Sequence, residues 1–197
     1  LEDCQLVVEI FESTELMVFS LERGRLTGLE LDRPGGSVAA FDYLYLPRLH
    51  RKGFVAPVAD LEQSISSPGG YVLDSKPGIF EDVVLLDFKS LYPSIIRTFH
   101  VDPLAMIVAS EESDPIPGFK ESQFSRDNYI LPEIIENLWD ARDQAKKLKK
   151  TAMSQAIKII MNSFYGVMGT TGCRFFDPKL ASSITLRGHE ILQTTRN

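Results

Sequence analysis

One acidic residue, Asp87, stands at the end of an apolar run and just before a turn-forming segment. The run covers residues 83–86 and predicts a strand over residues 83–88 that is buried on both faces. A carboxylate there is costly to bury unless a cation meets it, and carboxylate oxygens are ligands that hard divalent cations prefer. The alternative, which Asp87 taken alone favours, is a residue that caps the next turn.

The residues that follow Asp87 favour the metal interpretation. Ser90 and Leu91 can present backbone N–H groups to an anion, as successive amides in a turn do. Tyr92 precedes Pro93, which restricts the backbone of Tyr92 and thereby fixes the position of its ring. An acid, a pair of amides and an aromatic wall together predict a site where a metal ion and an anionic substrate meet.

A second group of polar residues shares one face of a predicted helix. Lys158, Asn162 and Tyr165 stand at positions i, i+4 and i+7. A lysine with an amide one turn later is what a phosphate-binding helix face offers. The alternative is a polar face turned to solvent.

A third pair, Arg142 and Lys146, also lies at i and i+4. In one continuous helix Lys146 and Lys158 would be ~18 Å apart along the axis, too far to hold one triphosphate. Two antiparallel helices ~8–10 Å apart would bring them level. The phosphate hypothesis therefore predicts a chain reversal near residues 149–153, and the neighbouring Lys147, Lys149 and Lys150 are assigned to a basic surface.

The elements that must position these residues are mostly helical. Helices are expected over residues 2–23, 37–51, 132–165 (as a hairpin) and 178–191, strands over residues 71–73, 83–88 and 104–109, a loop over residues 53–70 and an exposed insertion over residues 110–128. Trp139 and the aromatic residues of 41–45 are assigned to the core. Strands mixed with longer helices predict an α+β fold rather than a regular βαβ winding.

The composition of the chain argues against several classes of protein. The chain has 197 residues, 44% of them hydrophobic and 24% charged, and a formal net charge of −6. That charge argues against a nucleic-acid clamp over the whole surface but allows a local basic patch. No apolar run is long enough to cross a membrane, and two distant cysteines indicate a reducing compartment and no zinc site. The charged start without Met suggests a piece of a longer protein.

Two motifs resemble a known family. The pattern Asp87-x-x-Ser90-Leu91-Tyr92-Pro93-Ser94-Ile95-Ile96 resembles the first palm motif of family B DNA polymerases, and Lys158-x-x-x-Asn162-Ser163-x-Tyr165-Gly166 resembles their fingers motif. Residues 68–72 and 172–178 resemble most closely the bacterial DNA polymerase II branch. The resemblance implies an α+β fold made of a partial palm sheet, an antiparallel helical fingers hairpin and N-terminal helices.

It also implies a division of the chain into four parts. Residues 1–66 would be the end of an exonuclease region with linker helices, 67–131 the first part of the palm, 132–168 the fingers and 169–197 a truncated second part of the palm.

The resemblance further implies a role for each candidate residue. Asp87 and the Phe88 backbone carbonyl would bind a catalytic Mg²⁺ pair, while Tyr92 would pack under the sugar and exclude a 2′-hydroxyl. Tyr165 would lie against the nascent base pair. The triphosphate would be held by the amides of Ser90 and Leu91 and by the side chains of Arg142, Lys146, Lys158 and Asn162.

The implied reaction is attack of a primer 3′-hydroxyl on the α-phosphate of a deoxynucleotide. The implied partners are primer–template DNA, deoxynucleoside triphosphates and, through other regions of the protein, a sliding clamp, with no membrane. A 3′–5′ exonuclease elsewhere in the protein, work in DNA replication and repair, and a place in the bacterial cytoplasm at the nucleoid are part of the same expectation.

The family's second palm aspartate has no counterpart in this sequence, so we expect this polypeptide alone to be inactive. Two other classes stay open. A nucleotide- or DNA-binding module without chemistry would use the same basic helices. A purely structural interaction domain would leave the stripe of Lys158, Asn162 and Tyr165 unexplained.

Overall fold

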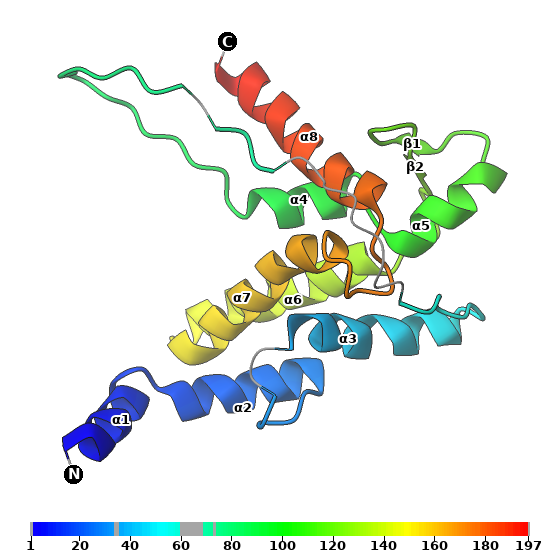
Figure 1. Cartoon of the computed structure of the whole chain (residues 1–197). Coiled ribbons are helices and arrows are strands. Elements are labelled where there is room, and N and C mark those ends of the chain that lie inside the picture. Colours follow the sequence, from blue (N-terminus) through cyan, green and yellow to red (C-terminus); the bar gives the residue numbers. More distant parts are fainter. Residues whose placement is uncertain (1, 34–35, 60–68, 73, 197) are drawn as a thin grey trace.

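The computed structural model describes residues 2–33, 36–59, 69–72 and 74–196 (Figure 1). Its elements, in chain order, are α1 (Glu2–Ser13), α2 (Leu16–Thr27), α3 (Ser37–Arg51), α4 (Leu91–Thr98), α5 (Pro103–Val108), the 3₁₀ turn η1 (Ala109–Glu111), β1 (Ile116–Pro117), β2 (Gln123–Phe124), α6 (Leu131–Lys147), α7 (Thr151–Met168) and α8 (Pro178–Arg196). None of the helices in these ranges is long and apolar enough to cross a membrane.

The helices pack in layers around α6 and α7. These two run side by side through the middle of the molecule, with α2 and α3 on one side and α4 and α8 on the other (Figure 1). The apolar face of α7 supplies buried residues such as Ile160 and Phe164 to the core. Phe164 meets the Phe41 ring of α3 edge-on, with ring centroids 5.6 Å apart, and Phe41 stacks on Tyr45 at 5.2 Å. The assignment of the 41–45 aromatics to the core is confirmed for Phe41 and Tyr45.

The predicted helical hairpin is confirmed. α6 ends at Lys147 and α7 begins at Thr151, so the chain reverses over three residues. No glycine marks the turn: Lys149 itself takes the left-handed conformation, with φ 55°, and the Lys150 N–H closes the turn on the Ala145 carbonyl at 2.8 Å. The turn therefore depends on a backbone conformation that a lysine rarely adopts.

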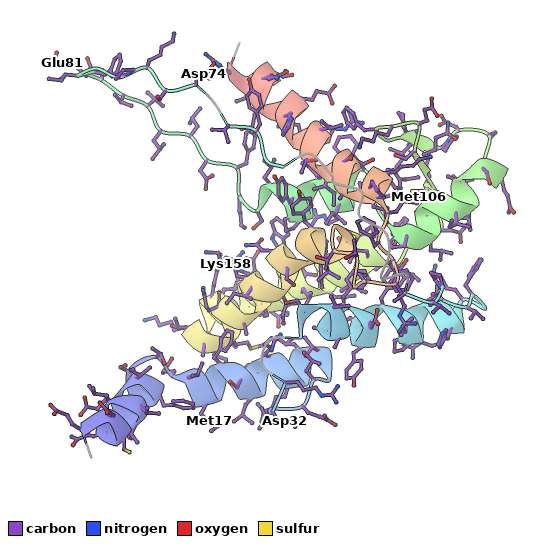
Figure 2. All side chains as sticks on the ribbon, viewed as in Figure 1. Met17, Asp32, Asp74, Glu81, Met106 and Lys158 are labelled. Carbon is purple, nitrogen blue, oxygen red and sulfur yellow. The ribbon has the colours of Figure 1, made fainter. Side chains whose placement is uncertain are left out.

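The predicted strand over residues 83–88 is wrong for this structure. The segment has no regular secondary structure and is exposed; Leu85, for example, is 91% exposed. It belongs to an excursion away from the helices whose far end is Glu81 (Figure 2). A strand needs a neighbour for its backbone hydrogen bonds, and no segment in the described ranges pairs with this one. The predicted strand at residues 71–73 is likewise absent at Tyr71 and Val72, and Leu73 lies outside the described residues.

Residues 104–109, predicted as a strand, form most of helix α5 and the start of η1. The apolar run is too short for its periodicity to distinguish the two structures. The flanking residues decide: Pro103 occupies the first turn and the Asp102 side chain accepts from the Ala105 N–H. Both are signals for the start of a helix.

Residues 110–128, predicted as an exposed insertion, are partly packed. β1 and β2 pair antiparallel with Ile116 opposite Phe124, and Phe124 is fully buried. Only two short strands form in the described ranges, so the molecule is mostly helical with a small antiparallel sheet. This is consistent with the α+β prediction, whereas the predicted palm sheet does not form there.

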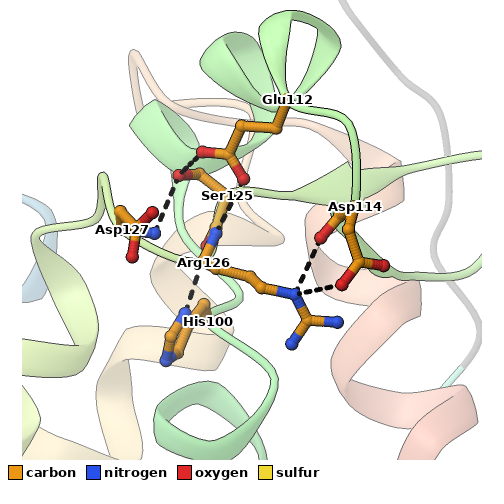
Figure 3. Close-up of polar contacts among 6 residues, drawn as sticks. All are labelled: His100, Glu112, Asp114, Ser125, Arg126 and Asp127. Atoms are coloured by element: carbon orange, nitrogen blue, oxygen red, sulfur yellow. Dashed lines mark hydrogen bonds and ion pairs between the residues drawn. The ribbon is translucent and has the colours of Figure 1, made fainter.

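A polar network closes the base of this insertion (Figure 3). One carboxylate oxygen of Glu112 accepts from the Ser125 hydroxyl and the other from the Arg126 N–H. Arg126 Nε donates to the Asp114 carbonyl at 2.7 Å, and His100 Nδ1 donates to the Ser125 carbonyl at 3.1 Å. Because His100 contacts the carbonyl of Ser125 rather than its hydroxyl, the network stabilises the insertion and is not a nucleophile–base pair.

The remaining helix predictions differ in their outcome. The helix predicted over residues 2–23 is broken into α1 and α2, because Glu15 is left-handed with φ 50°. The helix over residues 37–51 is confirmed as α3, and the last helix is confirmed as α8 and extends to Arg196. In the loop predicted over residues 53–70, residues 53–59 and 69–70 carry no regular element, and residues 60–68 lie outside the described ranges.

Candidate functional site

The turn before α4 presents the residues of the first motif. Ser90 precedes the helix in a left-handed conformation, with φ 54°, and has no side-chain bond to the helix end. Pro93, Ile95 and Ile96 are buried and anchor the short helix in the core. Because the first amides of a helix have no partner within it, the N–H groups of the first turn of α4 are available to an acceptor from outside.

Arg142 connects this turn to the fingers-like hairpin. Its Nη1 donates to the Ser90 hydroxyl at 3.4 Å across 52 positions of sequence. Its Nε is buried and has no hydrogen-bond partner among the described residues. A buried guanidinium N–H without a hydrogen-bond partner costs free energy. An anionic ligand that accepts from Arg142 Nε would remove this cost, so Arg142 is a candidate ligand for an anion.

Three further contacts join α6 to α4 and to the turn before it, beside Arg142. Lys89 Nζ lies 3.9 Å from Asp143 Oδ1. Lys89 and Arg97 each place their charge 5.4 Å from the centre of the Trp139 ring. Trp139 is half-buried and packs against the hydrophobic core, so its assignment to the core is confirmed in part, and its ring also meets two cations.

These contacts were not predicted from the sequence. The spacing of Trp139, Arg142 and Asp143, at i, i+3 and i+4, was a signal that they share a face of α6. Nothing local indicated that this face would meet Lys89, which precedes α4, and Arg97 in the last turn of α4.

The two motif tyrosines meet as an aromatic pair. The rings of Tyr92 on α4 and Tyr165 on α7 have centroids 4.8 Å apart and are tilted by 54°. Both are half-buried, and burial is the main cause that raises the pKa of Tyr165, followed by the nearby Tyr92. A side-chain carbon placed on Gly70 would lie 3.3 Å from the Tyr92 hydroxyl. The backbone at residue 70 thus closely approaches one edge of the pair.

The other predicted phosphate ligands lie on the surface of the hairpin. Lys146, Lys158 and Asn162 are all exposed, and Lys158 points outward from α7 (Figure 2). Lys146 lines a concavity of about 450 Å³ at the hairpin turn together with Lys149 and Lys150. The structure thus brings Ser90, Arg142, Tyr92 and Tyr165 together. The side chains of Lys146, Lys158 and Asn162 do not join this group and remain exposed to solvent.

The Asp87 carboxylate can bind a hard cation, but a metal site needs further ligands beside it. It is exposed, and it has no hydrogen-bond or ion-pair partner in the part of the chain that the structure describes. Its carboxylate and the adjacent Phe88 carbonyl are oxygen donors of the kind that Mg²⁺ takes. Among the described residues no cluster of three or more His, Cys, Asp or Glu side chains could hold a metal. The residues therefore fit part of a magnesium site.

Comparison with known proteins gives the family. The sequence model of the family described as DNA polymerase family B matches residues 35–197. The chain is 55% identical over 199 residues to DNA polymerase II of Escherichia coli K12, covering 100% of this chain and 25% of that protein. It is 30% identical over 215 residues to the DNA polymerase of Thermococcus gorgonarius, covering 99% of this chain and 27% of that protein.

A solved structure shows that the fold is shared as well. The family B DNA polymerase of Pyrobaculum calidifontis aligns with a TM-score of 0.70 at 22% identity, covering 95% of this chain and 27% of that one. The chain spans about a quarter of the length of the bacterial relative. The sequence match over most of the chain and the shared fold confirm the resemblance inferred from the two motifs: the chain belongs to DNA polymerase family B.

Proposed function

We propose that the protein that contains this chain is a DNA-directed DNA polymerase, which adds deoxynucleotides to a primer 3′-hydroxyl. The observation that carries the proposal is the Arg142–Ser90 contact, because it joins the fingers-like hairpin to the palm-like turn around an unused guanidinium donor. The primer–template DNA and the nucleoside triphosphate are its partners in this proposal. The family and the names of the relatives support it.

In this proposal the residues of the site bind and orient the nucleotide. The amides of Ser90 and Leu91 and the cations of Arg142, Lys146 and Lys158, together with the Asn162 amide, bind the phosphates. Tyr92 packs under the sugar and selects the deoxy form, while Tyr165 lies against the new base pair. The 4.8 Å contact between the two rings supports a shared wall.

Asp87 and the Phe88 carbonyl would hold Mg²⁺. When bound, Mg²⁺ stabilises negative charge on the oxygens that enter and leave the α-phosphate. The exposure of Asp87 supports this role, because its carboxylate has no hydrogen-bond or ion-pair partner among the described residues and is therefore available to a cation.

The proposal extends to the whole protein. It includes a 3′–5′ exonuclease in another region, work in DNA replication and repair, a location in the bacterial cytoplasm at the nucleoid and contact with a sliding clamp. It also includes the division into an exonuclease end (1–66), palm (67–131), fingers (132–168) and second palm part (169–197). The bounds of α6 and α7, from Leu131 to Met168, support the third part, the fingers.

The test is primer extension by the full-length protein. Asp87→Ala is expected to abolish extension without lowering the melting temperature, because Asp87 is exposed and makes no contact that folding needs. Glu81→Ala is the matched control, since Glu81 is an exposed acid on the same excursion (Figure 2). Extension retained by Asp87→Ala would refute the metal role.

A second candidate is a nucleotide- or DNA-binding module without chemistry, favoured by the lysine-lined concavity at the hairpin turn. Nucleotide binding by the full-length protein without extension would support it. Residues 1–197 alone are expected to be inactive with Mg²⁺, and robust extension by this polypeptide would contradict that expectation.

A further inference from the structure

Among the described residues, the buried side chain of Asp102 accepts four hydrogen bonds, and it was not predicted as a site residue. It is 0% exposed. Its Oδ1 accepts from the Ala105 N–H at 2.7 Å, and its Oδ2 accepts from the Tyr45 hydroxyl at 3.0 Å. The same Oδ2 accepts from the N–H groups of Leu131 at 2.7 Å and Ile130 at 3.2 Å. Four donors thus converge on one buried carboxylate.

Three of these donors lie in three different helices, and the fourth, Ile130, directly precedes α6. Ala105 belongs to α5, Tyr45 to α3, and Leu131 is the first residue of α6. α6 has no side-chain cap of its own, because the residue that precedes it is Ile130. A helix start leaves N–H groups without partners and attracts negative charge. Asp102 meets both needs of α6 from 29 positions earlier in the sequence, so it acts as a cap brought in by the tertiary fold.

Tyr45 fixes the carboxylate in this role. Its hydroxyl donates to Asp102 and accepts from the Leu104 N–H at 3.0 Å. The hydroxyl is therefore bound on both sides, and it holds Asp102 between α5 and the start of α6. The start of α6 is consequently attached to α3 and α5, which lie outside the hairpin.

A small movement at this attachment would reach Arg142. Arg142 is 11 residues beyond Leu131, which is about 16 Å along a helix at 1.5 Å per residue. A tilt of about 10° at the start of α6 would displace Arg142 by roughly 3 Å over that length. This displacement is nearly as large as the 3.4 Å distance between Arg142 Nη1 and the Ser90 hydroxyl, so it would break that contact.

We propose that Asp102 is a positioning residue for nucleotide binding: by holding the start of α6, it sets the place of Arg142 over the turn at Ser90. This inference rests on the proposed polymerase function. Asp102 itself is 0% exposed, so it cannot contact a ligand directly. Its effect on the reaction is through α6 alone.

The test is nucleotide incorporation by the full-length protein with Asp102→Asn. The amide has the same shape but no negative charge for the start of α6. In either orientation its NH₂ group replaces one accepting oxygen and faces at least one N–H donor, from which it cannot accept. We expect the KM for the nucleotide to rise about tenfold or more, with a smaller change in kcat and unchanged affinity for primer–template DNA. A residue with a purely structural role would lower the melting temperature and leave KM unchanged.

Two further variants keep the test decisive. Ser122→Ala is the matched control: Ser122 is also buried and bonds to the Phe119 carbonyl and the Ser183 hydroxyl, neither of which belongs to α6. It is expected to lower the melting temperature without changing KM. Tyr45→Phe leaves the bonds from Asp102 to α6 but removes the hydroxyl that holds the carboxylate in place, so its KM is expected to rise by only about two- to fivefold.

The outcomes separate the two hypotheses. If the wild type extends primers and Asp102→Asn has an unchanged KM, the positioning role is refuted. If Asp102→Asn does not fold, an unchanged KM for Tyr45→Phe refutes it instead. A wild-type protein that extends no primer would refute the proposed function itself.

Discussion

The contact between Arg142 and Ser90 allows a sharp test of how the nucleotide is bound. Arg142 is half-buried, its Nη1 reaches Ser90 and its Nε has no partner in the described part of the chain. Arg142→Lys keeps the charge but loses the planar fork that matches phosphate oxygens. Arg142→Met keeps most of the apolar stem and loses the charge.

The expected loss follows from the kind of bond. A hydrogen bond to a charged group contributes about 1.5–3 kcal/mol. At 1.4 kcal/mol for each factor of ten, removal of the Arg142–phosphate interaction raises the KM for the nucleotide by about 10- to 150-fold. Arg142→Met is expected to reach the upper part of this range and Arg142→Lys the lower part. Ser90→Ala loses only the long hydrogen bond from Arg142, so the KM for the nucleotide is expected to rise by about 2- to 10-fold.

The assay is single-nucleotide incorporation by the full-length protein at saturating primer–template DNA. The melting temperature without nucleotide gives an independent check. Because Arg142→Met removes a buried donor that has no partner, the variant is not expected to melt earlier than the wild type. A KM for Arg142→Lys equal to that of the wild type would refute the reasoning. So would a marked loss of stability in Arg142→Met, since the side chain would then serve the fold.

Three other regions give simpler predictions. Trp139→Leu is expected to lower the free energy of unfolding by about 1–2 kcal/mol in urea, because the ring contacts of Arg97 and a lysine are lost; a Trp139→Phe variant that lost as much would contradict this cause. A serine hydroxyl, a backbone N–H and a nearby arginine hold the pKa of Glu112 below its ordinary value of 4.5. The stability that Glu112 contributes is therefore present above pH 4.5 and is lost as the pH falls below it. Melting temperatures from about pH 6 to about pH 3 should fall less steeply in Glu112→Gln, and parallel curves would count against the argument. Burial raises the pKa of the Cys173 thiol to about 11, whereas Cys4 is exposed; a thiol reagent at about pH 8 should therefore label Cys4 alone in the native protein, as peptide mapping would show.

The helices were predictable where local signals suffice. Ser37 and Arg51 bound α3 as expected, because the apolar spacing between them and the turn before them are local features. The hairpin at Lys149 was predicted for a different reason. No residue marks the turn, but two lysines could share one triphosphate only if the chain reversed.

The strand predictions failed because strands depend on partners. The apolar run before Asp87 has the composition of a buried strand, yet it is exposed where no neighbour pairs with it. The run at residues 104–109 became helical because Asp102 and Pro103 favour a helix start. A helix satisfies its backbone within itself, whereas a strand needs a second segment.

The sequence by itself determined the family and most of the candidate ligands, because Asp87, Ser90, Arg142, Lys158 and the residues near them are specified by type and spacing within short motifs. Only the tertiary structure decided how these motifs are joined. The bond from Arg142 to Ser90 spans 52 positions, and the cations on Trp139 come from another part of the chain. The bonds from Asp102 to α6 span 28 and 29 positions. Such contacts form only when folding brings distant donors and acceptors together, so no local pattern along the chain records them.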